Sequence, residues 1–336
     1  MMQQSVLFSG IQPSGKLTLG NYLGAIKNWI NLQNEYFCLF SIVDLHALTV
    51  HQDPKFFKEQ CYDTLAIYLA SGIDFKNNII FLQSHVPGHS QLSWILSCYT
   101  HIGELNRMIQ FKNKMKNYAK DCTNVGIFIY PILMAADILL YKSLVIPVGI
   151  DQKQHLEISR DIAARFNKVY GKIFVIPEIY YSSIGTKIMS LQKINKKMSK
   201  SDNDIDGTIY LLDTKDQIVN KCRKAVTDSG KEIYFDYKSK PGISNLLTIL
   251  AAISNRTIND WCIDLRQVDY KEFKDIVAEY IIKYLNPIQD KYHNIRHDKG
   301  YLDNLLKIGA ERASKIANKN LLQIHKVLGL ITLNNT

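Results

Sequence analysis

The strongest constraint on the fold is the regular alternation of short apolar runs and longer amphipathic segments over the first 170 residues. The apolar runs typical of buried strands are Val6–Phe8, Phe37–Val43, Ile79–Leu82 and Val145–Val148. Segments with helical periodicity are expected from about Leu19, from Asp53–Pro54 to Gly72, and over Ser90–Tyr99, Ile132–Tyr141 and Gln152–Tyr170. Strands that alternate with helices predict an α/β fold with a doubly wound parallel sheet.

A shift in pattern marks the second half of the chain. Beyond Ser201 the periodicity is helical, and helices are expected over Lys215–Val226, Ile243–Ile253, Lys271–Tyr284 and Tyr301–Leu328. The sequence therefore predicts an α/β domain over residues 1–196 and a C-terminal helical domain over residues 197–336. The last helix is a candidate to pack back on the first domain.

Composition excludes several classes of protein. The N-terminus lacks a basic segment followed by a long apolar run, so no signal peptide is expected. The most apolar stretch, residues 131–150, contains Asp137 and Lys142, which argues against a membrane span. The six cysteines show no CxxC spacing, so no metal site is expected, and reduced thiols fit the cytoplasm. The net charge of +10 suits a polyanion such as RNA, although lysine-rich composition explains it equally well.

The first candidate site is the turn after the first strand. Gly10, Gly15 and Lys16 nearly match a phosphate-binding P-loop, but Leu17 stands where that motif needs a hydroxyl. A glycine-rich turn without function is the simplest alternative. A better nucleotide interpretation is that Thr18–Asn21 opens a helix, whose first N–H groups and dipole favour phosphate.

The second candidate is the pentapeptide KMSKS at Lys197–Ser201. Two lysines three residues apart on a loop can both reach a polyphosphate, whereas most basic runs are simply solvated. KMSKS is a signature of class I aminoacyl-tRNA synthetases, whose other signature is a HIGH-like tetrapeptide after the first strand. TLGN at Thr18–Asn21 resembles that tetrapeptide. HIGE at His101–Glu104 is closer in letters, but it lies in a helical region and is interpreted as structural.

Longer runs resemble the tryptophanyl-tRNA synthetases, of the bacterial type, over the chain to about residue 330. They are FSGIQPSG from Phe8, IVDLHALTV from Ile42, LMAADILLY from Leu133, PVGIDQKQH from Pro147, KKMSKSD from Lys196 and KPGISNLL from Lys240. The resemblance implies a Rossmann-like catalytic domain for ATP and tryptophan, and a helical domain for the tRNA anticodon. It also implies a cytoplasmic homodimer, with L-tryptophan, ATP and tRNA(Trp) as partners. Magnesium would arrive on ATP, with no protein-bound metal.

The resemblance also assigns site residues. Those implied for ATP are Gln12, Pro13, Ser14, Gly20, Asn21, Gly149, Ile150, Asp151, Ile188, Lys197, Met198, Ser199, Lys200 and Ser201. Those implied for catalysis, by charge neutralisation and phosphate positioning, are Thr18, Asn21, Lys114, Lys197 and Lys200. Those implied for tryptophan are Phe8, Val43, His46, Tyr130, Met134, Asp137, Ile146, Val148 and Gln152. Ile150 departs from the acidic residue usual in relatives, so only a backbone contact to the ribose would survive there.

Asp137 has two competing interpretations. An aspartate within an apolar helix is costly unless its carboxylate is paired, so a buried salt bridge or a capping contact would explain it. Acceptance of the indole N–H of tryptophan would explain it too, and would reject phenylalanine. Met134, one turn earlier, would line the ring. His46 is either a pocket residue or a satisfied core histidine, and His85, His89 and His155 match no metal-ligand spacing.

The expected activity is that of a tryptophan–tRNA ligase. Tryptophan would react with ATP to give tryptophanyl-adenylate and pyrophosphate, and the acyl group would then pass to the 3' end of the tRNA. The alternatives are a tyrosyl-tRNA synthetase, a P-loop ATPase and a non-enzymatic RNA-binding paralogue. Intact Lys197–Ser201 and Asp137 speak against the paralogue, which need not retain both.

Overall fold

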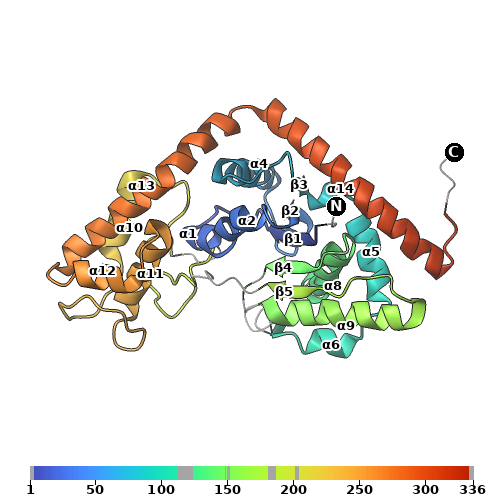
Figure 1. Ribbon diagram of the computed structural model, residues 1–336, viewed down its shortest axis with the longest axis horizontal. Coiled ribbons are helices and arrows are strands. Elements are labelled where there is room, and N and C mark those ends of the chain that lie inside the picture. Colours follow the sequence, from blue (N-terminus) through green and yellow to red (C-terminus); the bar gives the residue numbers. More distant parts are fainter. Residues whose placement is uncertain are drawn as a thin grey trace.

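A five-stranded parallel sheet occupies the centre of the molecule (Figure 1). The computed structural model describes residues 4–109, 111–112, 124–147, 149, 152–180, 187–200 and 204–332. The strands, in the spatial order β3-β2-β1-β4-β5, are β1 (Val6–Ile11), β2 (Phe37–Ile42), β3 (Ile79–Leu82), β4 (Val145–Pro147) and β5 (Glu178–Tyr180). All four neighbouring pairs are parallel, which confirms the predicted α/β class.

Helices surround the sheet and build the rest of the molecule. The helices of the first half are α1 (Leu19–Asn21), the π-helix η1 (Tyr22–Ile26), α2 (Lys27–Leu32), α3 (Asp44–Ala47), α4 (Pro54–Ser71), the 3-10 helix η2 (Gln83–His85), α5 (Gly88–Ser97), α6 (Ile102–Asn106), α8 (Val125–Leu139) and α9 (Lys153–Tyr170). Those of the second half are α10 (Lys215–Lys224), α11 (Pro241–Ser254), α12 (Ile258–Asp264), α13 (Tyr270–Arg296) and α14 (Lys299–Leu328).

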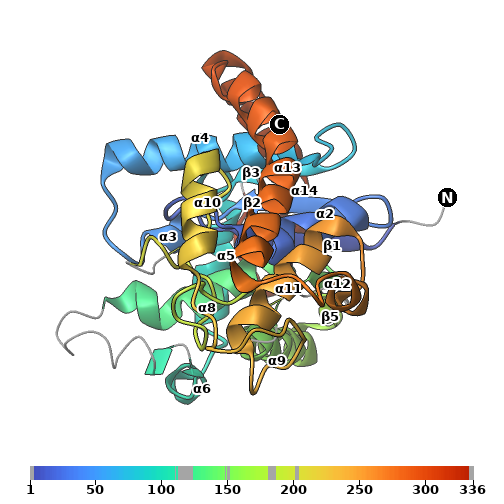
Figure 2. The ribbon, with the colours of Figure 1, turned by 90° about the vertical axis from the view of Figure 1, so that its left-hand side faces the viewer.

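The two faces of the sheet carry different hydrophobic clusters, because successive side chains of a strand point to opposite faces. Leu7 and Phe40 belong to the cluster that includes α2 and α4. Phe8, Leu39 and Phe81 belong to the cluster that includes α5, α8 and α9. Figures 1 and 2 both show α4 on one side of the sheet and α9 on the other. The sheet is therefore doubly wound, as predicted.

The strand order reverses between β1 and β4. From β1 the chain moves outward through β2 to β3, and β4 then pairs with the opposite edge of β1, where Leu7 faces Val145. Open α/β sheets bind ligands at the carboxyl ends of the strands on either side of such a reversal. This topology directs attention to the residues that follow β1 and β4.

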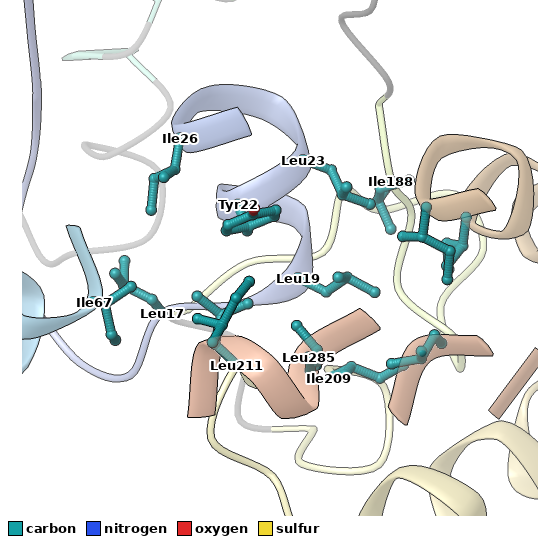
Figure 3. Packing of buried hydrophobic residues seen from close by; sticks show 14 of the residues in the cluster. Leu17, Leu19, Tyr22, Leu23, Ile26, Ile67, Ile188, Ile209, Leu211 and Leu285 are labelled. Atoms are coloured by element: carbon teal, nitrogen blue, oxygen red, sulfur yellow. The ribbon is translucent and has the colours of Figure 1, made fainter. Parts of the chain in front are cut away.

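The second half of the chain packs closely on the first. Leu211 and Leu285 share a buried cluster with Leu17 and Leu19, at the start of the first helix (Figure 3). α13 and α14 together arch over the sheet (Figure 1). Because this apolar cluster is continuous across the predicted boundary at 196/197, the division into two domains stays a prediction.

α14 returns to the sheet and packs against β3. A Cβ atom on Gly309 would lie 1.8 Å from the carbonyl oxygen of Ile80, so only glycine permits this approach. Arg312 Nη1 donates hydrogen bonds to the carbonyl oxygens of Phe75 and Asn78, both at 2.8 Å. The last helix thus lies directly on the backbone of β3 and holds the segment before that strand by side-chain donors.

Several elements differ from the sequence-based expectation. α8 begins at Val125 instead of Ile132 and continues through Pro131, because Asn124 caps it by accepting the N–H of Ile127 at 3.0 Å. α13 likewise continues through Pro287 to Arg296. β5 and α12 were not predicted, since three and seven residues give too little periodicity. In the described part of the chain, no helix combines the length and apolarity that crossing a membrane requires.

Candidate active site

The two signature segments, far apart in sequence, meet at the carboxyl end of β1. The Lys200 ammonium donates a hydrogen bond to the carbonyl oxygen of Gln12 at 2.8 Å. A Cβ atom on Gly20 would lie 3.4 Å from Cβ of Met198, so the lysine segment lies directly on the first turn of the helix. The structure therefore brings residues 12–20 and 198–200 into one site.

The TLGN segment is held in place by its own side chains and by the second half of the chain. The side chain of Thr18 accepts the N–H of Asn21 at 3.1 Å, and the side chain of Asn21 accepts the N–H of Thr18 at 3.1 Å. The N–H of Leu19 donates to the carbonyl of Ile209 at 2.8 Å. Thr18 is fully buried. These bonds fix the helix start, and the expected phosphate contacts of Thr18 and Asn21 stay predictions.

The lysine segment continues a short arm that folds back on itself. The N–H of Met198 donates to the carbonyl of Ile188 at 2.9 Å, and Met189 pairs with Lys197 in an antiparallel bridge. Asn245 on α11 clamps the arm, since its side chain both accepts from and donates to the backbone of Met189 at 2.9 and 3.0 Å. The sequence analysis missed Asn245, although the KPGISNLL run contains it.

Exposure separates the residues of this arm. Ile188 and Met198 are buried in the apolar cluster, whereas the Lys197 side chain is exposed and Lys200 is partly buried. Burial of its ammonium lowers the pKa of Lys200 to about 7, while part of the side chain remains in solvent. A bound polyphosphate would raise that pKa again by favouring the charged form.

The residues predicted for tryptophan converge from four elements around the strand reversal. Phe8 lies on β1, and Ile146 lies on β4. Val43 follows β2 directly, His46 lies on α3 just beyond it, and both are buried. The residues from α8 are Tyr130, Met134 and Asp137. Pro13 is buried as well, and Gln12 and Ser14 complete the turn after β1.

Asp137 lies at the centre of a buried polar network. His46 Nε2 lies 2.9 Å from Oδ2 of Asp137, while His89 Nδ1 and Gln83 Nε2 lie 2.6 and 2.7 Å from Oδ1. Burial alone would raise the pKa of this carboxyl, but the hydrogen bonds from His46 and His89 outweigh it and the pKa is lowered. Asp137 is therefore an ionised acceptor. Its pairing matches the salt-bridge interpretation and leaves the indole interpretation open.

Two further predicted pocket residues make contacts with neighbours. Tyr130 lies edge-on to His46, with ring centroids 6.5 Å apart, and its hydroxyl lies 2.6 Å from Nε2 of His155. The backbone N–H of Gln152 donates to the carbonyl of Gly149 at 2.9 Å. His155 thus has a hydrogen-bond partner inside the protein. Lys114, Val148, Ile150, Asp151 and Ser201 lie outside the described residues.

His101, in the HIGE segment that resembles HIGH in letters, caps a short helix. It precedes α6, and its backbone N–H donates to the Glu104 side chain at 3.0 Å. Glu104 in turn pairs with Arg165 on α9. His101 therefore lies at a helix start and not, as expected, within a helix, and its contacts are those of a structural cap.

Two other findings concern possible ligands. Within the described ranges, no group of three or more histidine, cysteine, aspartate or glutamate side chains is placed to hold a metal ion. A cavity of about 740 Å³ lies between α4, η2 and α14, and its lining includes Lys58, His85 and Lys307. None of the predicted site residues lines it, so it is separate from the site at β1 and β4.

Comparison with known proteins places this geometry in a family. Residues 2–287 match the family model of tRNA synthetases class I (W and Y). The structure of tryptophanyl-tRNA synthetase from Mycoplasma pneumoniae is 35% identical, with a TM-score of 0.89 over 99% of this chain and 100% of that chain. The chain belongs to the tryptophanyl-tRNA synthetases. It is therefore a class I aminoacyl-tRNA ligase, which confirms the predicted family and enzyme class.

Other solved structures agree with this family. Tryptophanyl-tRNA synthetase from Campylobacter jejuni, complexed with ADP and tryptophan, is 32% identical with a TM-score of 0.82 over 97% of this synthetase and 100% of that chain. Tyrosyl-tRNA synthetase from Aeropyrum pernix is 16% identical with a TM-score of 0.68, over 91% of this synthetase and 89% of that chain, and shares the fold alone. The specificity for tryptophan over tyrosine and the predicted tryptophan–tRNA ligase function follow. The P-loop ATPase alternative is wrong.

Proposed function

We propose that tryptophanyl-adenylate forms at the carboxyl ends of β1 and β4. The observation that carries the proposal is the contact of Lys200 with the carbonyl of Gln12, 2.8 Å away, which joins the KMSKS segment to the turn after β1. A carboxylate oxygen of tryptophan attacks the α-phosphorus of ATP, and the bond from that phosphorus to the bridging oxygen breaks. Pyrophosphate leaves.

The protein supplies positioning and charge in this step, and no enzyme nucleophile is needed. The turn of Gln12–Ser14 and the backbone at Gly20 hold the nucleotide, with Thr18 and Asn21 shaping the helix start beneath the phosphates. Lys197 and Lys200 neutralise charge as it develops on pyrophosphate, and Lys114 assists. The remaining ATP contacts come from Gly149, Ile150, Asp151, Ile188, Met198, Ser199 and Ser201. Magnesium arrives with ATP, because hard oxygen ligands of the phosphates suit it.

Asp137 accepts the indole N–H of tryptophan in this proposal. Support comes from its ionised state and from its place on the buried face of α8 beside His46. Phe8, Val43, Met134, Ile146 and Val148 enclose the ring, while Tyr130 and Gln152 bind the polar end of the amino acid. Phenylalanine lacks an N–H donor and would leave the carboxylate without one partner.

The second step transfers tryptophan to tRNA. A terminal ribose hydroxyl attacks the acyl carbon, and AMP leaves. We assign the anticodon contact to a hollow of about 600 Å³ beside α12. Tyr234, 40% exposed, lines it with Asn259 and Arg266, and the Lys240 ammonium lies 4.9 Å from the Tyr234 ring. An aromatic face with polar side chains nearby suits an unstacked base.

Exposed apolar residues near α8 support a homodimer. Trp94 on α5, Ile102 on α6 and Val125 at the start of α8 are 73%, 70% and 69% exposed. Exposed apolar side chains gathered on neighbouring elements are typical of subunit interfaces. Light scattering of the wild-type protein and of Trp94→Glu tests this assignment, because a monomeric wild type contradicts it. The cytoplasmic location stays a prediction.

ATP–pyrophosphate exchange tests the catalytic proposal. We expect exchange that depends on tryptophan and is unsupported by tyrosine at the same concentration. Exchange driven by tyrosine, or none with either amino acid in the folded protein, would contradict the proposal. Aminoacylation of tRNA(Trp) then tests the second step separately.

A further inference from the structure

Three buried side chains outside the predicted pocket surround Asp137. Gln83 is the first residue of η2, His89 lies on α5, and Tyr141 follows α8; their exposed fractions are 0%, 0% and 1%. Gln83 and His89 both contact Oδ1 of Asp137, and the Tyr141 hydroxyl lies 2.8 Å from Nε2 of His89. No catalytic step described above uses these residues.

The direction of each hydrogen bond follows from the charge on Asp137. An ionised carboxylate only accepts, so the His89 nitrogen that faces it, Nδ1, must carry a hydrogen. Burial raises the pKa of Tyr141 well above its usual range, so its hydroxyl keeps its hydrogen, and the hydroxyl oxygen lies 2.8 Å from the other ring nitrogen, Nε2. Tyr141 thereby holds the orientation of the His89 ring.

The two oxygens of Asp137 consequently differ in free acceptor capacity. Oδ1 accepts from both Gln83 and His89, which uses the two lone pairs of a carboxylate oxygen. Oδ2 accepts only from His46 among the described residues. One acceptor position therefore remains on Oδ2, the oxygen on the side of His46, which is itself predicted to line the pocket.

We propose that Gln83, His89 and Tyr141 are positioning residues that orient Asp137 so that Oδ2 accepts the indole N–H of tryptophan. The inference rests on the proposed role of Asp137 and extends it to side chains that do not touch the substrate. Because Oδ1 is held by two donors, the carboxylate cannot rotate without breaking both bonds. Discrimination for a ring N–H then depends on Gln83 and His89, which lie 54 and 48 positions from Asp137 in sequence, and on Tyr141, which contacts His89.

Tyr141 also links the network to the pocket wall. Its ring stacks on Phe8, with centroids 5.8 Å apart, and lies edge-on to Phe81 at 5.8 Å. Replacement by phenylalanine retains both ring contacts and removes only the hydroxyl. Tyr141→Phe is therefore the mildest probe of the network.

The test compares tryptophan with β-(benzothienyl)alanine, in which sulfur replaces the indole N–H. The kcat/KM values for both in ATP–pyrophosphate exchange give a discrimination ratio for wild type and each variant. Loss of a charge-assisted bond is worth roughly 10- to 100-fold, so His89→Leu and Gln83→Leu should lower the ratio by about that factor. His89→Asn retains a donor close to the position of Nδ1 and should retain most of the ratio. Tyr141→Phe should lower the ratio by a smaller factor.

The possible outcomes distinguish the positioning role of Gln83, His89 and Tyr141 from the proposed role of Asp137. If His89→Leu and Tyr141→Phe slow both substrates equally, the network is only structural and the inference is wrong. If Asp137→Asn itself leaves the ratio unchanged, Asp137 does not read the N–H, and the proposed role fails together with the inference. If only Asp137→Asn lowers the ratio, the proposed role stands and the inference falls. Should His89→Leu unfold, Tyr141→Phe and His89→Asn decide the matter.

Discussion

Asp137 is the residue on which recognition of tryptophan depends. In Asp137→Asn one carboxylate oxygen becomes an amide N–H₂ that faces donors, so a charge-assisted bond is lost. We expect weaker tryptophan binding by about 1.5–3 kcal/mol, with ATP binding nearly unchanged. The KM values from ATP–pyrophosphate exchange measure both. His101→Ala is the control, since that residue caps α6 and should retain normal activation. An unchanged tryptophan KM would contradict the assignment.

Lys200 should act on the rate of adenylate formation more than on ATP affinity. Its charge matters most as negative charge builds on the departing pyrophosphate, so Lys200→Ala should lower kcat for adenylate formation. A preorganised cation there is worth roughly 2–4 kcal/mol, by analogy with oxyanion donors. Pre-steady-state adenylate formation without tRNA measures the effect. A normal rate combined with failed aminoacylation would show that the segment only docks tRNA.

The low pKa of Lys200 predicts proton uptake when ATP binds. Below pH 7 the ammonium is charged with or without ATP, so no proton is taken up. Above pH 7 the free site is mostly neutral, while the phosphates of bound ATP favour the charged form. ATP affinity should therefore fall as pH rises from 7 to 9. Calorimetry at pH 8 in buffers of different ionisation enthalpy should show uptake approaching one proton, and Lys200→Met should abolish it.

The site was predictable where sequence motifs carry it and unpredictable where only the fold does. Thr18–Asn21 and Lys197–Lys200 are short signatures that the sequence shows directly, and the structure brings them together where Gly20 meets Met198. Gln83 and His89 lie in none of the quoted sequence runs, and Tyr141 ends the LMAADILLY run without any sign of its role. The partner of each side chain lies about 50 residues away in sequence, so only the fold brings the two together. His89 was considered only as a metal ligand, and its actual partner is Asp137.

Elements with clear end signals were predicted best. Asp53, Pro54 and Gly72 mark α4, and the structure has Asp53 as the cap, Pro54 as the first residue and Gly72 in the left-handed conformation. The π-helix η1 could not be predicted, because Tyr22–Ile26 has the periodicity of an ordinary α-helix. β5 is too short to show a pattern and is defined by its pairing with β4, whereas α12 has a local start signal, the capping box of Thr257 and Asp260, that the sequence analysis missed.

The packing of α14 on β3 gives a prediction at the scale of an element. Gly309→Ala places a Cβ on the carbonyl of Ile80, so the helix must shift, at a cost of about 1–3 kcal/mol in the free energy of unfolding. Gly300→Ala, in the first turn of the same helix, meets nothing closer than 3.5 Å and should be neutral or stabilising. Chemical denaturation of both variants checks this. Equal stability of the two would show that α14 does not rest on β3.

The charge of the whole molecule gives a prediction about tRNA. The excess of +10 is spread along the chain, so the tRNA backbone should meet positive charge over a wide surface. Each neutralised phosphate releases counterions, and the affinity for tRNA should fall steeply between about 50 and 200 mM salt. Filter binding at several salt concentrations measures this. Tryptophan-dependent ATP–pyrophosphate exchange, which needs no tRNA, is the control and should change much less.

The placement of α14 has a consequence for synthesis. β3 is an edge strand of the described sheet, and α14 lies against its backbone where Gly309 meets the carbonyl oxygen of Ile80. A nascent chain that has not yet released residues 299–328 from the ribosome therefore carries an uncovered edge, which is a template for pairing with another chain. A chain terminated just before Lys299 should therefore accumulate in inclusion bodies and should not accumulate as a folded enzyme of reduced activity. By covering the edge of β3, the last helix thus protects the protein from aggregation.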